Sequence, residues 1–177
     1  SIFDDNPVIF IEHRWLHNQI GEVPKGYYSI PIGKAHVMKQ GNDITVVTSL
    51  DMAVEALNIA ERIKLQKIDI EVIDLCTVKP LDEKTILDSV RKTGHLLVID
   101  SSWKDFGVAS QVAAMVAEKG YEYLDGAIRR IGLPDIPSPS SSALSKGYYP
   151  RAKNICQMIE EMLSVKIDIS AFEEEML

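Results

Sequence analysis

Cysteine is scarce in this sequence of 177 residues, which contains only Cys76 and Cys156. Two isolated cysteines do not form the disulfide framework of a small secreted domain, so we expect a reducing compartment. Long apolar runs are missing as well, because none approaches the roughly 18–20 residues that a membrane-spanning helix needs. The sequence therefore indicates neither a disulfide-stapled domain nor a membrane protein.

Positive charge is also in short supply. Lysine and arginine together number 19, against 26 aspartates and glutamates, and the formal net charge is −7. Proteins that bind nucleic acids through the phosphate backbone cluster lysine and arginine on one surface. The charge balance therefore argues against a generic nucleic-acid binder.

The beginning of the chain lacks both an initiator methionine and a targeting signal. Its first residues, SIFDDNPVIF, contain no basic region followed by an apolar core, so a signal peptide is not expected. A strand is expected to start already at Val8. We expect the chain to be a piece of a longer protein.

Several common catalytic and cofactor motifs are absent. The sequence has neither of the glycine-rich phosphate loops, G-x-G-x-x-G and G-x-x-x-x-G-K-[ST], and no G-x-S-x-G nucleophile elbow. It therefore predicts no nucleotide-binding loop and no hydrolase of the elbow type.

What the sequence does contain is an alternation of apolar runs and amphipathic segments. Strands are expected at 8–11, 30–39, 44–48, 70–75, 96–99 and 128–131. Helices are expected at 51–65, 82–92, 106–118 and 151–163. This order predicts a three-layer α/β domain with a largely parallel sheet and right-handed crossovers. Because residues 40–43 have turn composition, the two runs that flank them are candidates for an antiparallel hairpin.

Three helix ends carry recognisable signals. Ser49 or Asp51 is available as the N-cap of the helix at 51–65. Asp82 is the predicted N-cap of the next helix, with Leu81 and Ile86 spaced as a hydrophobic staple. Gly94 is the predicted stop of that helix.

Ligands of such sheets bind beyond the carboxyl ends of the strands, so the polar residues there are candidate site residues. They are Thr48, Ser49, Asp74, Asp100, Ser101, Ser102 and Gly132. Asp100 and the two serines have the polarity of a site. A loop that enters a helix uses the same residue types for capping, which is the interpretation that we favour.

Other reactive residues have both a functional and a structural interpretation. Cys76 follows a strand and is a candidate nucleophile, although no base is indicated for it. His13 and His17 have the spacing of two metal ligands on a helix but no third ligand, which favours surface or interface histidines. Arg129 and Arg130 either bind an anion or, as we favour, pair with carboxylates.

Aromatic side chains gather in or beside the predicted loops. They are Trp15, Trp103, Phe106, Tyr148 and Tyr149. Aromatic residues in loops serve partner contacts or local cores, and both interpretations stay open. The long loop at 12–28 is a further candidate contact surface. Our candidate interface residues are His13, Arg14, Trp15, Trp103 and Phe106.

Several stretches together resemble one family. They are IPIGKAHVMKQGNDITVVT, EVIDLCTVKPLDEKTILDSVRKTGHLLVIDSSWKDFGV, YLDGAIRRIGLPDIPSP and the closing helix. They are similar to the C-terminal domain of transketolase-like enzymes. The nearest resemblance is to the β subunit of the thiamine-diphosphate-dependent decarboxylating component of 2-oxo acid dehydrogenase complexes, pyruvate dehydrogenase type. The resemblance covers roughly residues 7–163 and leaves 164–177 as an acidic C-terminal tail.

The resemblance implies a mixed, mostly parallel five-stranded sheet in which residues 30–39 form the one antiparallel strand. It also implies an assembly role. The expected partners are the pyrimidine-binding domain of the same subunit, an α subunit, the acyltransferase core and further copies of the chain. Thiamine diphosphate and magnesium are expected in the full enzyme and not in this fragment. No catalytic, cofactor or metal residue is assigned, and the isolated domain is expected to be inactive.

Two other readings of the resemblance stay open. One is the C-terminal domain of a transketolase or a deoxyxylulose-phosphate-synthase-like enzyme. The other is a non-catalytic interaction module of the same fold. The expected location is the cytoplasm, or the mitochondrial matrix in a eukaryote. Asp100-Ser101-Ser102 and Gly132-Leu133 depart from the residues that are common in the family at these places.

Overall fold

The computed structural model describes residues 1–145, 147–170 and 172. A five-stranded sheet lies at its centre, with the strands in the order β1-β3-β2-β4-β5. The strands are β1 (His36–Lys39), β2 (Ile44–Thr48), β3 (Ile70–Asp74), β4 (Leu96–Trp103) and β5 (Arg129–Leu133). β1 is antiparallel to β3, and the other pairs are parallel. The mixed sheet with one antiparallel strand is therefore confirmed.

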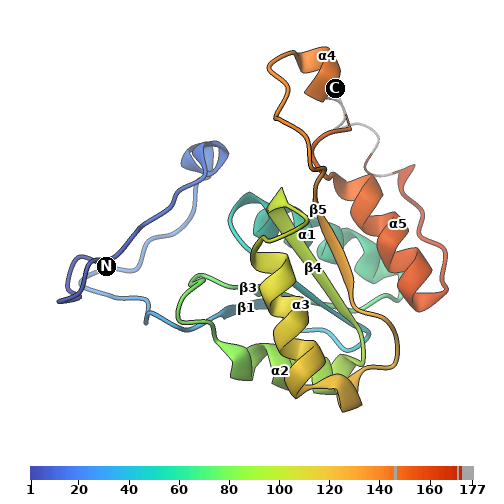
Figure 1. The fold of residues 1–177 in the computed structure, drawn as a ribbon, viewed down its shortest axis with the longest axis horizontal. Coiled ribbons are helices and arrows are strands. Elements are labelled where there is room, and N and C mark those ends of the chain that lie inside the picture. Colours follow the sequence, from blue (N-terminus) through green and yellow to red (C-terminus); the bar gives the residue numbers. More distant parts are fainter. Residues whose placement is uncertain (146, 171, 173–177) are drawn as a thin grey trace.

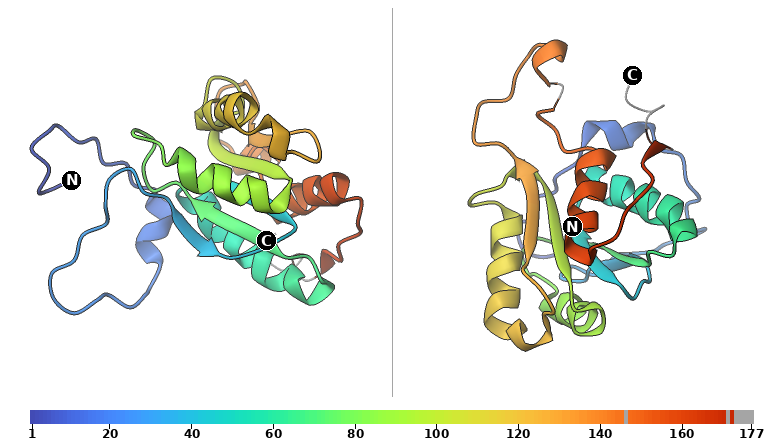
Figure 2. Two further views of the ribbon diagram at one scale, coloured as in Figure 1. Left: turned by 90° about the horizontal axis from the view of Figure 1, so that it is seen from below. Right: turned by 90° about the vertical axis from the view of Figure 1, so that its right-hand side faces the viewer.

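Helices cover both faces of the sheet (Figures 1 and 2). The four long helices are α1 (Asp51–Ile63), α2 (Glu83–Thr93), α3 (Val108–Lys119) and α5 (Ala152–Leu163). The short elements are η1 (Arg14–Asn18), η2 (Lys64–Gln66), η3 (Tyr121–Tyr123) and α4 (Ser142–Ser145). α1 and α5 pack on one face and α2 and α3 on the other, which confirms the three layers. No helix among the described residues is long and apolar enough to cross a membrane.

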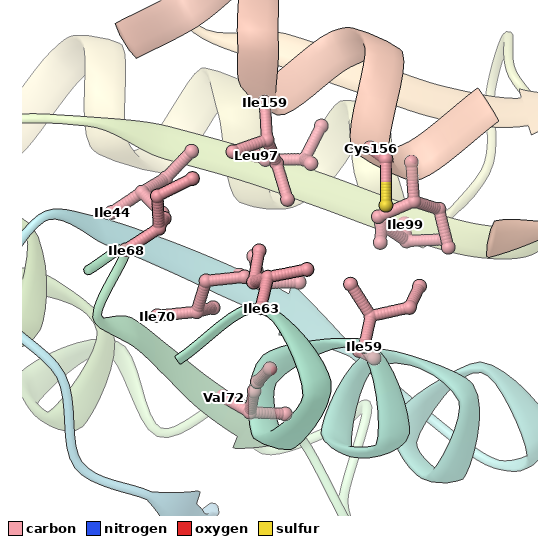
Figure 3. Close-up of a cluster of buried hydrophobic side chains, with 14 of the residues drawn as sticks. Ile44, Ile59, Ile63, Ile68, Ile70, Val72, Leu97, Ile99, Cys156 and Ile159 are labelled. Atoms are coloured by element: carbon pink, nitrogen blue, oxygen red, sulfur yellow. The ribbon is translucent and has the colours of Figure 1, made fainter. Parts of the chain in front are cut away.

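Each face of the sheet has its own buried cluster, because successive side chains of a strand point to opposite faces. In β2, Ile44 and Val46 join the cluster under α1 and α5, whereas Val47 joins the cluster under α2 and α3. Figure 3 shows the first cluster, with Cys156 and Ile159 of α5 directed at the sheet. Residues after α5 extend this cluster, since Ile167 and Phe172 are buried in it.

The hairpin expected between residues 30–39 and 44–48 is wrong. β1 pairs with β3, because the turn at 40–43 crosses over the beginning of β3. The backbone N–H groups of Asn42 and Asp43 donate to Asp69 O at 3.0 and 2.9 Å. A Cβ at Gly41 would lie 2.1 Å from the carbonyl carbon of Ile70, so only glycine allows this close crossing.

Several expected boundaries also differ from the structure, and the strand expected at 96–99 continues to Trp103, so Ser101 and Ser102 lie in β4 and not in a loop. Residues 8–11 form no strand and lie exposed, because nothing in the described chain pairs with them. β1 is limited to His36–Lys39 within the expected 30–39. The third long helix begins at Val108, so Phe106 precedes it and is fully exposed instead of facing the sheet.

The helix-end signals are only partly confirmed. Asp82 accepts a hydrogen bond from Thr85 N at the start of α2, and Gly94 ends that helix at a φ of 71°. Neither Ser49 nor Asp51 caps α1, whose N-cap is Leu50 without a side-chain hydrogen bond. The Asp51 carboxylate instead accepts a hydrogen bond from Ser101, with 2.9 Å between Oδ1 and the serine Oγ.

Candidate binding surface at the carboxyl edge of the sheet

Residues 1–33, which we call the arm, precede the sheet and contain no buried residue. The arm extends to one side of the body and returns to it (Figure 1). Its apolar side chains face solvent, and Ile9, for example, is 89 % exposed. The other exposed large apolar residues of the arm are Ile2, Phe3, Val8, Phe10, Ile11, Trp15, Ile20, Val23, Tyr27, Tyr28, Ile30 and Ile32. So much exposed apolar surface is typical of a segment that contacts another protein or domain.

The arm is attached to the body around η1. His13 Nε2 lies 3.7 Å from Asp51 Oδ1 in the first turn of α1. The ring of Trp15 packs edge-on against Tyr149 at 6.2 Å, and the Arg151 guanidinium lies 5.5 Å from the centre of the same ring. An imidazole, an indole and a guanidinium therefore join the arm to the starts of α1 and α5.

A pocket of about 480 Å³ lies between the arm and the body, and we call it the arm pocket. It opens at the carboxyl ends of β2 and β4, the edge at which sheets of this class bind ligands. Its lining comprises Ile11–Trp15 of the arm, Ser49–Met52, Asp100–Ser102 and Tyr149–Arg151.

Asp100 has a structural task at this edge. Its Oδ1 accepts from Ser102 N at 3.0 Å, and its Oδ2 accepts from Ala109 N at 3.2 Å in the first turn of α3. A Cβ at Gly107 would lie 2.9 Å from Asp100 Oδ2, so glycine lets the carboxylate approach the helix. The capping interpretation of Asp100 is therefore confirmed.

Arg130 of β5 contacts the loop between β4 and α3 through its guanidinium. Its Nη1 donates to Lys104 O at 2.6 Å and to Ser110 Oγ at 2.7 Å, and its Nη2 lies 3.8 Å from Asp105 Oδ1. The favoured pairing with a carboxylate thus holds for Arg130, through Asp105, and nothing in the described chain tests it for Arg129. Trp103, the last residue of β4, and Phe106 of the loop both face solvent, and Phe106 is 104 % exposed.

Backbone strain concentrates at the same edge. Leu50, Cys76 and Phe106 each follow the carboxyl end of a parallel strand by two or three residues and have positive φ of 55°, 51° and 60°. Non-glycine residues in this region store strain, which proteins retain mainly at functional sites. The carboxyl edge is therefore the strongest candidate for a functional surface among the described residues.

The candidate nucleophile and the candidate metal ligands gain no support. Burial of the thiol, and then the neighbouring Asp74 carboxylate, raise the pKa of Cys76 to about 11, although the residue as a whole is exposed. A thiol with such a pKa is almost wholly protonated at neutral pH and a poor nucleophile. His13 and His17 face different carboxylates, Asp51 and Glu12. No three His, Cys, Asp or Glu side chains of the described chain come together as metal ligands.

The five candidate interface residues fall into two groups. His13, Arg14 and Trp15 line the arm pocket, whereas Trp103 and Phe106 are outside its lining, at the end of β4 and on the loop that follows it. Asp51, Tyr149 and Arg151 complete the pocket but were not among the five. Tyr149 was recognisable as a loop aromatic. Asp51 and Arg151 look like ordinary residues at helix starts, and their spacing gives no signal that the arm returns to them.

Comparison with known proteins agrees with the fold. The family model "Transketolase, C-terminal domain" matches residues 33–155. The fold is also similar to a solved structure described as "Split gene transketolase, inactive beta4 tetramer". The TM-score is 0.68 at 24% identity, covering 84% of this chain and 47% of the other.

Curated relatives match over most of this chain. The β subunit of acetoin:2,6-dichlorophenolindophenol oxidoreductase from Bacillus subtilis is 38% identical over 163 residues, 92% of this chain and 48% of the relative. The pyruvate dehydrogenase E1 component subunit beta from Rickettsia bellii is 36% identical over 94% of this chain and 51% of the relative. The 2-oxoisovalerate dehydrogenase subunit beta from Bacillus subtilis is 39% identical over 84% of this chain and 46% of the relative.

The chain thus spans about half the length of the curated relatives that it matches. It is homologous to the E1 β subunits of 2-oxo acid dehydrogenases. With a family model that covers most of the sheet and its helices, the chain belongs to the transketolase C-terminal domain family.

Proposed function

We propose that the chain is the C-terminal assembly domain of a thiamine-diphosphate-dependent 2-oxo acid dehydrogenase β subunit of the pyruvate type. The observation that carries the proposal is how far the match extends. The alignment with the Bacillus relative covers 163 residues, which is more than the chain has from residue 33 onward, so it includes part of the arm. Arm and body therefore correspond to a continuous part of a longer β subunit.

The exposed arm supports an assembly role. Burial of apolar surface drives association, and the arm exposes apolar side chains along its whole length. Val8–Ile11 is an extended apolar run without a partner in the described chain, as expected of a strand whose sheet lies in a preceding domain. We propose the pyrimidine-binding domain as that neighbour.

The proposed partners beyond this domain are an α subunit, the acyltransferase core and further copies of the chain. Trp103 at the end of β4 and Phe106 on the loop held by Arg130 are the proposed contact residues outside the arm. Self-association of the isolated chain is expected, and a monodisperse monomer at high concentration in light scattering would count against it. The proposed location is the cytoplasm, or the mitochondrial matrix in a eukaryote.

Cofactor chemistry is proposed to reside outside this chain. Thiamine diphosphate supplies the reactive ylid in such enzymes, while the protein positions it. We assign this chain no catalytic role and expect no thiamine diphosphate binding by the isolated chain in calorimetry.

A chimaera tests the proposal. This chain replaces the C-terminal half of the Bacillus acetoin oxidoreductase β subunit, and the product is co-expressed with the matching α subunit. We expect co-purification with the α subunit and restored thiamine-diphosphate-dependent activity. A matched chimaera that keeps the relative's own segment in place of the arm separates a mismatch in the arm from one in the body. A folded chimaera that never binds the α subunit would contradict the proposal.

A transketolase-type parent is the weaker alternative. The solved transketolase shares the fold at 24% identity, whereas the curated relatives at 36–39% are subunits of an acetoin oxidoreductase and of 2-oxo acid dehydrogenases. A chimaera that restores activity only with a transketolase α partner would favour this alternative.

A further inference from the structure

The charged groups that line the arm pocket are unevenly satisfied. All three of its carboxylates already have partners. Asp51 accepts from Ser101 Oγ and faces His13, while Asp100 accepts from two backbone N–H groups. Glu12 Oε2 lies 3.3 Å from His17 Nε2. No carboxylate of the pocket is left without a partner.

The two arginines of the pocket have no such partners. Neither the Arg14 nor the Arg151 guanidinium has a carboxylate or a hydrogen-bond acceptor among the described residues. The Arg151 guanidinium lies over the Trp15 ring, 5.5 Å from its centre. A guanidinium carries five donors in a planar fork that fits carboxylate and phosphate groups. Two guanidiniums without an acceptor among the described residues, at one pocket, therefore favour an anionic ligand.

Other features of the pocket add to the attraction for an anion. α1 begins at the pocket with Leu50 as its N-cap and no side-chain cap. Ala53 N–H donates to Leu50 O, which leaves the N–H groups of Asp51 and Met52 as the open donors at this positive end of the helix dipole. Nδ1 of His13 is buried and has no hydrogen-bond partner among the described residues, so it is a polar atom that a ligand can satisfy. Trp15 and Tyr149 offer aromatic surface beside these polar groups.

We propose that the arm pocket binds a small organic anion, a carboxylate or phosphate ester. Its charged group lies between Arg14 and Arg151, and its remaining part lies against Trp15 and Tyr149. The pocket of about 480 Å³ is large enough for a metabolite-sized molecule. Because Arg14 and Trp15 belong to the arm and Arg151 to the body, the bound anion also holds the two together.

Intrinsic fluorescence makes the test direct. The chain has two tryptophans, and Trp103 lies outside the lining of the pocket. In a Trp103→Phe background, Trp15 is the sole indole and reports on the pocket. We titrate this protein separately with inorganic phosphate and with acetate, at constant ionic strength set by sodium chloride, because screening alone weakens surface charge effects. We expect saturable changes with a Kd of about 1 mM or tighter for at least one of them.

Charge-matched variants locate the site. Arg14→Gln and Arg151→Gln are each expected to weaken the affinity about tenfold, because each removes one charge-assisted contact. Arg91→Gln is the control, because it removes the same charge from an arginine that does not line the pocket and stacks on Tyr123. It is expected to leave the affinity for the anion unchanged. Arg151→Lys keeps the cation next to Trp15 and is expected to lose less than Arg151→Gln.

Phosphate and acetate separate the two kinds of ligand group, since preference for one identifies a phosphate ester or a carboxylate. Unchanged Trp15 fluorescence with both anions would overturn the proposal. So would a loss of affinity in Arg91→Gln equal to that in the pocket variants. The proposal does not depend on the family function, because the titration uses this chain alone.

Discussion

Nε2 of His13 lies 3.7 Å from Oδ1 of Asp51, so a residue of the arm faces the first turn of α1 across the arm pocket. Together with the contacts of Trp15 to Tyr149 and Arg151, this pair fixes where the arm meets the body. None of these side chains belongs to the buried clusters on the two faces of the sheet. Removing them therefore affects the arm and not the core.

Replacing Trp15 with alanine is expected to release the arm. Trp15 is the only arm residue in ring contact with Tyr149 and Arg151 among the described residues. We expect Trp15→Ala to accelerate proteolytic cleavage within residues 1–33. Its stability should change by no more than about 0.5 kcal/mol, because the residue contributes nothing to the core. Trp103→Ala is the control, and equal cleavage of the two variants would contradict the arrangement.

Asp82 gives the chain a defined dependence on acid. Burial opposes ionisation of Asp82, but hydrogen bonds from Thr85 and Ala35 and the nearby Lys34 lower its pKa overall. A lowered folded pKa means that the unfolded chain takes up the proton first. This stabilisation is therefore present above the unfolded pKa of about 4 and is lost as the pH falls through the folded pKa.

Asp82→Asn keeps an oxygen acceptor for Thr85 N but removes the charge. We expect it to be less stable than the parent by about 1 kcal/mol at neutral pH. In urea titrations the difference should shrink as the pH falls through the folded pKa of Asp82, which lies below the unfolded value of about 4. A difference that stays constant as the pH is lowered through this range would contradict the assignment.

A cluster of buried hydroxyl groups joins β2 to α2 through Thr45. Because Thr48 of the same strand is outside this cluster, replacing the two threonines is expected to have opposite effects on stability. Thr45 Oγ1 lies 2.6 Å from Ser89 Oγ and 2.7 Å from Thr93 Oγ1. Thr45→Val removes a partner of both and is expected to cost about 1–3 kcal/mol. Thr48 Oγ1 is also buried but has no partner in the described chain, so Thr48→Val is expected to be neutral or stabilising. Chemical unfolding of the two variants in parallel is the measurement, and equal losses would refute it.

Gly41 is the position where the chain should tolerate no side chain. A Cβ there would lie 2.1 Å from Ile70 C and 2.3 Å from Glu71 N, both backbone atoms. Gly41→Ala is expected to cost more than about 4 kcal/mol or to prevent folding, because β1 can no longer reach β3. Gly21→Ala is the matched control, since a Cβ at Gly21 meets nothing within 4 Å. Similar melting temperatures for the two variants would contradict this account.

The inner strands could be predicted from their local sequences alone, because each is a short apolar run. The apolar runs of β2, β3 and β4 are buried on both faces, as parallel strands between helices must be. Val8–Ile11 has the same apolar composition, yet it forms no strand here. Apolar composition shows that burial of a segment is favourable, but it does not show which domain or protein covers that segment.

The hairpin and the arm pocket could not be read from the sequence for a related reason. Residues 40–43 have turn composition, but the strand beside β1 was decided by the close crossing of Gly41 over Ile70, a contact between segments far apart in the chain. The loop aromatics indicated a contact surface that includes Trp15. Its body partners, Asp51 and Arg151, were hidden because the return of the arm to the helix starts is a tertiary event.

The burial of Ile167 and Phe172 has a consequence for synthesis on the ribosome. The cluster under α2 and α3 draws its residues from the chain up to Ile128, so that face can close while the C-terminal part is still being translated. The cluster under α1 and α5 includes Phe172 and is completed only after residue 172 has been translated. A nascent chain shorter than this therefore carries one complete and one incomplete face, and the incomplete face is exposed to aggregation until residue 172 has emerged from the ribosome.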